Sequence, residues 1–365
     1  MRERVLLVGA SPLALRLAEA LRRQPERYRL LGVVDEAPLA GALPAGVAQL
    51  GTLEGLGRIL HEQRPHRVVL ALTARRGRLP LEPLLKARLR GVAVEEGLEL
   101  EERLLGKLAI EALPPSALIF SEGFRSSRLQ RGLNRALSLL VAVLGLLALL
   151  PLFALIACSI VLESGPPVFF RQERVGLAGR RFGLLKFRSM RPAPGPASEW
   201  ERDNGDRITR VGRVLRRYRL DELPQFINVL RGEMSLIGPR PHPLSNYELF
   251  SRAIPYYWIR ATAMPGVTGW AQVRYGYANG LEEETEKMRY DLYYIKHTSL
   301  WLDLRILAET LKVVLLGSDA SRARRASAPR KVVPITARTA ARRAAAARAP
   351  HEAAAAPDAW RRRQA

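Results

Sequence analysis

Asp221 and Glu222 are adjacent carboxylates set between an arginine run and the turn Gly-Pro-Arg-Pro at 238–241. Nearby cations favour the ionised form of a carboxyl, so we expect both side chains to stay charged. An ionised aspartate can act as a covalent nucleophile on phosphorus, and arginines bind phosphate oxygens as charge develops in the transition state. The pattern suits phosphoryl transfer. A surface salt-bridge network is the alternative.

The cations near this pair are Arg213, Arg216, Arg217 and Arg219 before it and Arg240 after it. A bound divalent cation would have the same effect on the carboxylates as these guanidinium groups. Pro224 ends the turn that carries the pair.

Strand and helix patterns alternate over the first 120 residues. Buried-strand patterns occupy 4–9, 28–36, 66–72 and 91–96, and helix patterns occupy 11–24, 53–63 and 81–90. Ser11 and Pro12 suit the start of the first helix. This alternation predicts an open parallel sheet with helices on both faces, a Rossmann-like domain.

Gly9 ends the first strand and Asp35 ends the second, which is the placement found in dinucleotide-binding domains. The loop "GASPLA" lacks the second and third glycines that let a backbone approach a pyrophosphate. We therefore favour a regulatory or scaffolding role for this domain over nucleotide binding.

Residues 136–162 contain no charged side chain and exceed the ~20 residues needed to cross a bilayer. Arginines flank the segment on both sides, which conflicts with a simple span because positive charge prefers the cytoplasmic face. Pro151 lies near the middle and favours a kink. We predict a re-entrant membrane helix that returns to the face it entered; a straight span and a soluble core helix are the alternatives.

Lysine and arginine outnumber aspartate and glutamate by 58 to 35, giving a formal charge of +23 that favours anionic partners. The single cysteine, Cys158, lies in the apolar segment, so disulfide and cysteine metal sites are excluded.

Nothing at the amino terminus resembles a secretion signal, so we expect synthesis in the cytosol. The alanine- and arginine-rich tail is expected to be disordered, and nucleic-acid binding is not expected because no recognition element accompanies its charge.

Tyr256, Tyr257 and Trp258 lie between Arg252 and Arg260. Aromatic residues interleaved with arginine suit the headgroup layer of a membrane. A buried aromatic cluster is the alternative interpretation.

Five stretches of sequence decide between phosphoryl transfer and a surface salt-bridge network as the role of the acid pair. In order they are "GPPVFFRQERVG" at 165–176, "FGLLKFRSM" at 182–190, the long stretch at 206–241 around the acid pair, "MPGVTGWAQV" at 264–273 and "YDLYYIKHTSLWLDLRIL" at 290–307. Together they closely resemble the bacterial sugar transferases, the monotopic polyprenyl-phosphate phosphoglycosyl transferases that start exopolysaccharide repeat units. The resemblance covers about 120–318, and the first domain resembles the Rossmann-like domain of the larger members.

The resemblance implies that Asp221 attacks the β-phosphate of a UDP-sugar, releases UMP and holds the phosphosugar until polyprenyl phosphate takes it. Glu222 would help to bind Mg²⁺, and Arg240 would bind nucleotide phosphate. Lys186, Arg188, Gln272 and Asp291 are further candidates for substrate binding in the same pocket, with structural roles as the alternative. The transferred sugar is expected to be a hexose.

The implied organisation is an α/β protein with a Rossmann-like domain at 1–120, a basic linker at 121–135, a re-entrant membrane helix at 136–162, a small α/β catalytic domain at 163–318 and a disordered basic tail at 319–365. The implied location is the bacterial inner membrane with the catalytic domain facing the cytoplasm. A homo-oligomer is a further possibility.

Two positions depart from the family pattern. Asn134 stands where aspartate is frequent, and Leu150 precedes Pro151 where serine is frequent. Each change removes a side-chain partner for the backbone at the bend, so we expect the details of the hairpin's anchoring to depart from the family pattern. Two rival functions use other parts of the chain. A sugar-nucleotide dehydratase or epimerase would need a Tyr-x-x-x-Lys pair, and 1–120 contain only Tyr28, without a lysine at residue 32. A non-catalytic membrane scaffold would tolerate loss of the acid pair.

Overall fold

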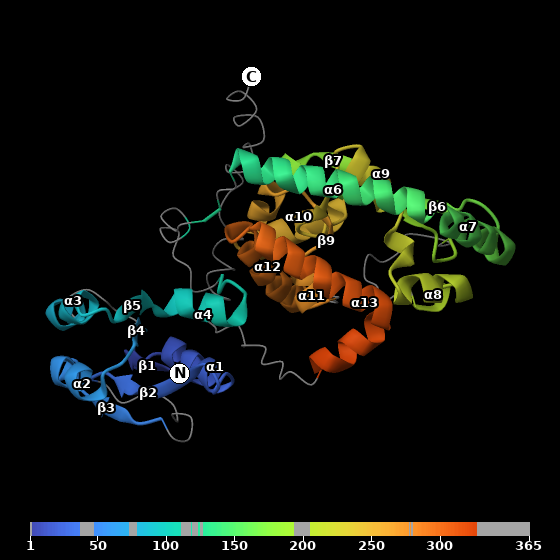
Figure 1. Ribbon diagram of the computed structural model, residues 1–365. Helices are drawn as coiled ribbons and strands as arrows, with labels where there is room; N and C mark the ends of the chain where they lie inside the picture. The colour runs from blue at the N-terminus through green and yellow to red at the C-terminus, as the bar shows by residue number, and fades with distance from the viewer. Residues whose placement is uncertain are drawn as a thin grey trace. The chain divides into compact units, whose positions relative to one another are not determined.

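The computed structural model describes residues 2–36, 47–72, 79–110, 118, 123–124, 127–192, 205–276, 278 and 280–326, with side chains up to residue 315. The chain forms two compact units, Met1–Ala109 and Ile110–Ala365 (Figure 1). The first unit ends earlier than the predicted limit at residue 120.

The first unit is a five-stranded parallel sheet in the order β3-β2-β1-β4-β5. Its strands are β1 Glu3–Val8, β2 Tyr28–Val34, β3 Gln49–Gly51, β4 Arg67–Leu70 and β5 Ala93–Glu96. Its helices are α1 Pro12–Arg22, α2 Leu56–Gln63, α3 Leu81–Leu89 and α4 Gly97–Leu105. The predicted Rossmann-like parallel sheet is confirmed, and β3 and α4 are elements that the sequence analysis did not identify.

Both faces of this sheet are covered because side chains alternate along β1. Val5 and Leu7 pack with Leu17 of α1, while Leu6 and Val8 pack with Leu56 of α2. Each fully buried side chain of this size contributes about 1.5–3 kcal/mol relative to exposure to water. Two apolar layers on opposite faces therefore hold the unit together.

The loop after β1 is fixed by backbone contacts. Gly9 has a φ of 113°, and a Cβ there would lie 2.6 Å from the carbonyl carbon of Ala71. The Asp35 carboxylate accepts hydrogen bonds from the backbone nitrogens of Ala10 at 2.5 Å and Glu36 at 2.7 Å. Asp35 thus ties the end of β2 to the loop where a dinucleotide-binding domain would use its acid to bind ribose.

The second unit opens with two apolar helices, α6 Arg128–Ala148 and α7 Leu150–Ser164. α6 begins inside the predicted linker, because Ser127 caps it by accepting a hydrogen bond from the backbone nitrogen of Gln130 at 3.1 Å. Of the helices described, α6 is long and apolar enough to cross a membrane, and α7 is a shorter apolar helix. The helices are interrupted at Leu149, and Pro151 lies in the first turn of α7, as the predicted kink requires.

Both helices pack against the same folded body. On α6, Ala142 is buried with Val229, and the hydroxyl of Ser138 lies 3.0 Å from that of Ser235. On α7, Ile160 is buried with Phe187. The chain therefore contacts one body before and after the break.

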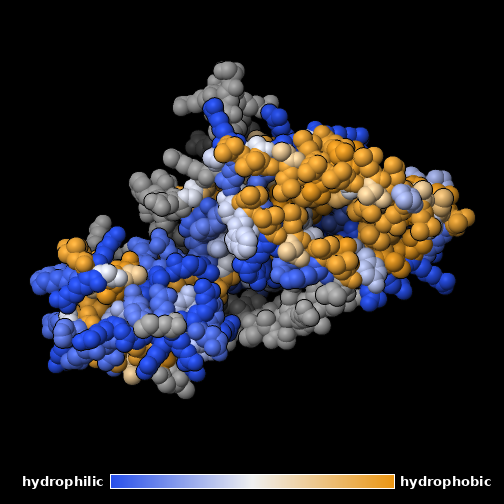
Figure 2. All heavy atoms as spheres, in the orientation of Figure 1, coloured by the Kyte–Doolittle hydropathy of each residue, from blue (hydrophilic) through white to orange (hydrophobic). Residues whose placement is uncertain are grey.

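The remaining surface of the two helices is apolar, and Figure 2 shows it as a broad hydrophobic area over α6 and α7. Its exposed side chains include Leu140, Leu144, Leu147, Leu150 and Leu155. A contiguous apolar surface of this kind marks an interaction with a membrane or another protein.

The body combines short sheets with helices, which confirms the predicted α/β character. The strands are β6 Phe169–Val175 and β7 Arg181–Phe187, which are antiparallel, and β8 Ser235–Ile237 and β9 Gly266–Thr268, which are parallel. The helices are α8 Arg210–Arg217, α9 Gln225–Leu230, α10 Leu244–Ala253, α11 Trp270–Arg274, α12 Leu281–Lys296 and α13 Leu300–Ala326, with 3-10 turns η1 Leu177–Gly179, η3 Leu220–Glu222 and η4 Tyr257–Thr262. α13 extends beyond the predicted start of the tail at 319, and residues 327–365 lie outside the described part.

The three consecutive aromatic residues divide between the two interpretations. Tyr257 is buried and hydrogen-bonded to His242 at 2.6 Å, whereas Trp258 is 61% exposed. Tyr257 therefore belongs to the interior, and Trp258 remains available to a membrane surface. The departure at Asn134 also has a structural setting: its side chain bonds to Asp303 of α13, whose pKa burial raises to about 6.

Candidate active site

The acid pair lies on the short turn η3, directly after α8. Thr209 caps α8 by accepting a hydrogen bond from the backbone nitrogen of Gly212 at 2.8 Å. Glu163, at the end of α7, accepts from the backbone nitrogens of Arg210 at 2.6 Å and Val211 at 2.9 Å. An acidic side chain is favourable at a helix amino terminus, so the apolar helix is tied to the element that presents the acid pair.

Arg219 enters the turn in the left-handed region, with a φ of 56°. This conformation is uncommon for a residue with a side chain and is concentrated at functional sites. The sharp reversal ends α8 and directs Asp221 and Glu222 inward, where they are only 7% and 6% exposed.

Glu222 is surrounded by cations. Arg240 contacts both of its oxygens, at 2.6 and 3.3 Å, while Arg219 lies at 3.8 Å and Lys186 at 3.9 Å. Burial opposes ionisation of Glu222, but the charges of Arg240, Lys186 and Arg219 outweigh it and hold its pKa well below the usual value. This carboxylate is ionised, as the sequence predicted.

Asp221 differs from its neighbour. Burial and the charge of Glu222 raise the pKa of Asp221, and the charges of Lys186, Arg216 and Arg240 only partly offset them. The cations favour the ionised form of Asp221, as expected, but desolvation and the adjacent carboxylate outweigh them, so the net shift of its pKa is upward. Asp221 lines the cavity described below, whereas Glu222 is engaged by Arg240.

Lys186 is presented by β7, whose backbone is fixed by Asn228 of α9. The Asn228 side chain accepts from the backbone nitrogen of Leu185 at 3.0 Å and donates to the carbonyl of Gly183 at 2.8 Å. Burial and the nearby charge of Arg240 lower the pKa of Lys186 to about 8, despite the opposing charges of the acid pair. Lys186 is therefore a cation that titrates close to neutral pH.

A cavity of about 600 Å³ adjoins the acid pair. Its basic lining residues are Arg174, Lys186, Arg188, Arg191, Arg207, Arg216, Arg219, Arg240 and Lys287. Asp221 and Glu284 are the acidic residues among the described lining. Phe169 and Phe170, at the start of β6 and close to the end of α7, add an exposed apolar margin. The cavity thus combines a cationic interior with an aromatic edge, which suits a polyanion that carries an apolar group.

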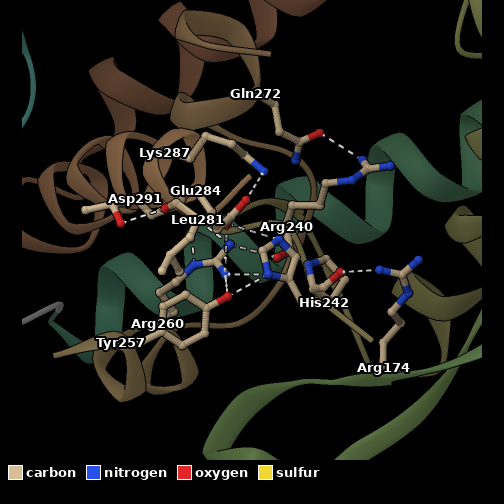
Figure 3. Close-up of polar contacts among 12 residues, drawn as sticks. Arg174, Arg240, His242, Tyr257, Arg260, Gln272, Leu281, Glu284, Lys287 and Asp291 are labelled. Atoms are coloured by element: carbon tan, nitrogen blue, oxygen red, sulfur yellow. Dashed lines mark hydrogen bonds and ion pairs between the residues drawn. The ribbon is translucent and has the colours of Figure 1, made fainter. Parts of the chain in front are cut away.

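Gln272 contacts two arginines that neighbour Glu222, and it lines the same cavity as Asp221. Its side-chain oxygen accepts from Arg240 at 3.1 Å (Figure 3) and from Arg219 at 3.4 Å. Arg188 also lines the cavity, but its guanidinium donates to the carbonyl of Pro166 at 2.9 Å and to the hydroxyl of Ser164 at 2.8 Å. Arg188 therefore secures the end of α7, in keeping with the structural alternative.

Asp291 is placed behind the cavity and is absent from the described lining. It accepts from Arg260 at 2.9 and 2.8 Å, and Arg260 donates to the backbone carbonyl of Arg240 at 2.9 Å. Burial raises the pKa of Asp291, and the charge of Arg260 works against that effect. Asp291 thus acts on Arg240 through Arg260.

Three residues that the sequence analysis did not select complete this region: His242, Glu284 and Lys287 line the cavity and are buried. Lys287 donates to Glu284 at 3.0 Å. Burial and the charge of Arg260 lower the pKa of His242 well below its usual value, so its imidazole is neutral. His242 lies two residues after Arg240, and Glu284 and Lys287 share a helix with Asp291. These positions in the sequence do not by themselves predict that the three side chains line the cavity.

The carboxylates of the acid pair are too few to hold a magnesium ion by themselves, but they could hold one together with oxygens from a bound substrate. Among the described residues, no three histidine, cysteine or acidic side chains are grouped to hold a metal. Magnesium is commonly bound by one or two carboxylates together with substrate phosphates and water. Glu222 supplies one such carboxylate next to a cavity suited to phosphate.

Residues 129–317 match the family described as bacterial sugar transferase, which is more than half of the chain. The chain belongs to the bacterial sugar transferase family. The predicted resemblance is confirmed, and its motifs supply the acid pair and much of the cavity lining.

Three curated relatives show what the family members do. The chain is 41% identical over 223 residues to a UDP-N-acetylgalactosamine-undecaprenyl-phosphate N-acetylgalactosaminephosphotransferase of Aeromonas hydrophila, covering 61% of this chain and 52% of that protein. It is 46% identical over 185 residues to a UDP-glucose:undecaprenyl-phosphate glucose-1-phosphate transferase of Xanthomonas campestris, covering 48% and 37%. It is 33% identical over 330 residues to an undecaprenyl-phosphate glucose phosphotransferase of Komagataeibacter xylinus, covering 88% and 60%.

Proposed function

We propose that this protein transfers a sugar 1-phosphate from a UDP-sugar to undecaprenyl phosphate. The observation that carries this proposal is the buried Asp221, next to Glu222, which lines a cavity rich in guanidinium and ammonium groups. The chain spans about 37 to 60% of the length of the relatives named above, and their printed activities support the proposal.

In the first step, an oxygen of Asp221 forms a bond to the β-phosphorus of the donor. The bond between that phosphorus and the oxygen bridging to the α-phosphate breaks, and UMP leaves with the electron pair. In the second step, a phosphate oxygen of undecaprenyl phosphate attacks the same phosphorus and releases the Asp221 carboxylate. The lipid diphosphate sugar and the restored enzyme result, so atoms and charge balance.

The surrounding residues prepare this chemistry. Burial leaves Asp221 poorly solvated, which makes its ionised form a better nucleophile once substrate binds. Arg240 and Lys186 are held next to the acid pair before substrate arrives, so they require little reorganisation to stabilise charge on phosphate oxygens. The contact of Asp291 with Arg260, and of Arg260 with the carbonyl of Arg240, fixes the position of Arg240.

Glu222 would bind magnesium together with phosphate oxygens. Its lowered pKa keeps it in the form that binds a cation. When bound, magnesium would neutralise diphosphate charge during displacement. Arg240 contacts both oxygens of Glu222, so it would share them with the metal or release one of them.

The two apolar helices would form a re-entrant anchor on the cytoplasmic leaflet. Their contacts with the same body on both sides of Leu149 support this arrangement over a straight span. The exposed apolar surface would enter the leaflet, and the cavity would lie at the depth of the acceptor's phosphate. Cysteines introduced at Arg128 and Arg180 test it: labelling of the two sites from opposite faces would exclude the re-entrant anchor.

The test of the function is to trap the enzyme intermediate. Purified full-length protein is incubated with UDP-sugars bearing a labelled hexose and without lipid acceptor, then digested and analysed by mass spectrometry. We expect UMP release and one modified peptide, carrying the phosphosugar on Asp221. As a control, the same experiment is run with a Glu248→Gln variant, which loses an exposed carboxylate away from the cavity and should still be labelled on Asp221. Turnover of a UDP-sugar without any modified Asp221 peptide would exclude the covalent step.

A further inference from the structure

Two amide or carboxyl atoms in the cavity wall have no hydrogen-bond partner among the described residues. They are the side-chain nitrogen of Gln272 and one carboxyl oxygen, Oε1, of Glu284. Both residues line the cavity, and they are only 4% and 2% exposed. Buried polar atoms are nearly always hydrogen-bonded, so two exceptions beside one cavity indicate a ligand.

The orientation of the Gln272 amide is fixed by its neighbours. Arg240 and Arg219 both donate to the same side-chain atom of Gln272, which must therefore be the oxygen. The nitrogen then points away from these guanidinium groups. In the view of Figure 3 it points toward the side where Lys287 and Glu284 lie. Gln272 thus offers a hydrogen-bond donor to the cavity.

Glu284 offers an acceptor. Its Oε2 atom accepts from Lys287 at 3.0 Å, which leaves Oε1 as the remaining oxygen. The Nε2 atom of His242 lies 3.3 Å from Oε1 but makes no hydrogen bond to it. Arg260 is farther, at 3.9 Å. The position of this carboxyl is set by Lys287, and its second oxygen remains unsatisfied.

The chemistry of the pair selects its ligand. Phosphate oxygens only accept hydrogen bonds, so they cannot satisfy Glu284 Oε1, and a carboxylate repels their charge. A metal ion cannot use the N–H groups of Gln272, and Lys287 opposes it. A hydroxyl group both donates and accepts, so it can satisfy either atom.

We propose that Gln272 and Glu284 form a hydroxyl-binding subsite for the donor substrate. It adjoins the phosphate-binding cations, because the oxygen of Gln272 contacts Arg240, which in turn contacts Glu222. The proposal rests on the proposed function, since a UDP-sugar provides hydroxyls on its hexose and on its ribose. Arg240 and Lys186 would bind the diphosphate, and Gln272 and Glu284 would determine which hydroxyl-bearing group is accepted beside it.

Two substitutions reverse the polarity of the subsite with almost no change in size. Glu284→Gln keeps an oxygen for Lys287 and places an NH₂ donor where Oε1 accepts. Gln272→Glu keeps an oxygen for Arg240 and Arg219 and replaces the donor with an acceptor. Glu282→Gln is the matched control, because Glu282 is an exposed residue on the same helix.

Binding is measured by calorimetric titration of the detergent-solubilised full chain in an Asp221→Asn background, so that turnover does not interfere. The probes are UDP-glucose, its analogues lacking single hexose hydroxyls, and UMP. A site built to bind a hydroxyl discriminates against the analogue lacking it, and we expect at least about 10-fold discrimination for one deoxy analogue. Each polarity variant should weaken UDP-glucose binding by about 10-fold or more and should lose that discrimination.

Comparing UDP-glucose, its deoxy analogues and UMP identifies which hydroxyls are bound. Weakened UDP-glucose binding with unchanged UMP binding assigns the subsite to the hexose. Parallel weakening of both ligands, without discrimination among deoxyhexose analogues, assigns it to the ribose. Wild-type affinities in both variants, or no binding of either ligand by the parent, would overturn the proposal. A melting temperature equal to that of the Glu282→Gln control confirms that a weakened variant is folded.

Failure of the subsite and failure of the proposed function give different results. If the wild-type enzyme binds UDP-glucose but releases no UMP from any UDP-sugar, the transferase function is wrong while the binding measurements still decide the subsite. If UMP is released normally and neither variant changes binding, the function stands and the subsite is wrong.

Discussion

Each unit of the protein places an aspartate at the end of an element, beside a loop that could receive a phosphorylated ligand, and the two aspartates have different surroundings. Asp35 ends β2, and its carboxylate accepts hydrogen bonds from the backbone nitrogens of Ala10 and Glu36. Asp221 lies on a 3-10 turn and faces a large cationic cavity. The first carboxylate completes its own loop, while the second faces a space that can hold a substrate.

The difference shows that position at the end of an element does not make an acid functional. The Asp35 carboxylate already accepts hydrogen bonds from two backbone N–H groups of its own unit. It therefore resembles a ribose-binding acid in its position at the end of β2 only. The left-handed Arg219 turns the chain so that Asp221 comes next to Lys186, Arg216 and Arg240. Availability of the oxygens and the surrounding charge distinguish the two sites.

The largest expected effect comes from changing the two aspartates to asparagine in parallel. Asp221→Asn should reduce UMP release at least about 1000-fold, because an amide cannot replace the carboxylate as nucleophile. Asp35→Asn should leave UMP release within about twofold but lower stability by roughly 1–3 kcal/mol, since an NH₂ group would face a backbone N–H. Release is followed by a UMP assay and stability by thermal unfolding.

A loss of UMP release in Asp35→Asn protein that remains folded would contradict this division of roles. It would indicate that the first unit contributes directly to turnover.

A smaller effect is expected from Arg240→Lys, which keeps the charge but loses the two-point contact with Glu222. We expect kcat to fall about 100-fold, because a lysine cannot present paired donors to a carboxylate or a phosphate. The pKa of Glu222 should rise, since Arg240 is the largest of the effects that lower it. The acidic limb of the pH-rate profile reports mainly Asp221, the acid of the pair with the higher pKa; Arg240 lowers that pKa too, so the limb should move to higher pH.

Arg181→Lys, on the exposed part of β7, is the matched control and should leave both kcat and the limb unchanged. An unaltered kcat in Arg240→Lys protein would remove Arg240 from phosphate binding.

The smallest effect concerns the charge of Lys186, whose pKa is lowered to about 8. The ammonium form predominates below that pH, so kcat/KM of the wild-type enzyme should decline as pH rises through about 8. Lys186→Arg should keep its charge and move this limb upward, with about 10-fold or smaller loss at neutral pH. Lys312→Arg, a surface change on α13, should keep the wild-type profile. A limb that remains near pH 8 in the Lys186→Arg enzyme would assign the titration to another group.

Much of the fold is readable because it depends on local pattern. The alternation of apolar residues in Val5, Leu6, Leu7 and Val8 predicts a strand buried on both faces, and Ser11 with Pro12 predicts the start of α1. The first and last residues of helices and strands are harder to predict from the sequence. α6 starts at Arg128 inside the predicted linker because Ser127 provides a cap, and helix propensity continues through its arginines.

The site is readable where a residue's role follows from its own chemistry and neighbours in sequence. Asp221, Glu222 and Arg240 are of this kind, and Lys186 and Gln272 lie beside them in the folded chain. Arg188 and Asp291 have the right chemistry for the pocket, but the structure commits them to the end of α7 and to Arg260. Glu284 and Lys287 could not be found from spacing, because the cavity joins α12 to residues far away along the chain.

The sequence by itself determined the parallel sheet of the first unit, the apolar segment with its break near Pro151 and the acid pair set among arginines. These depend on periodicity, on the charge-free length of a segment and on the chemistry of neighbouring side chains. Only the tertiary structure decided that Asp35 closes its own loop, that Asp221 has a raised pKa beside an ionised Glu222, and that Gln272 and Glu284 leave two polar atoms facing one cavity. Burial and the distances between groups from separate elements govern these properties, and neither is defined until the chain has folded.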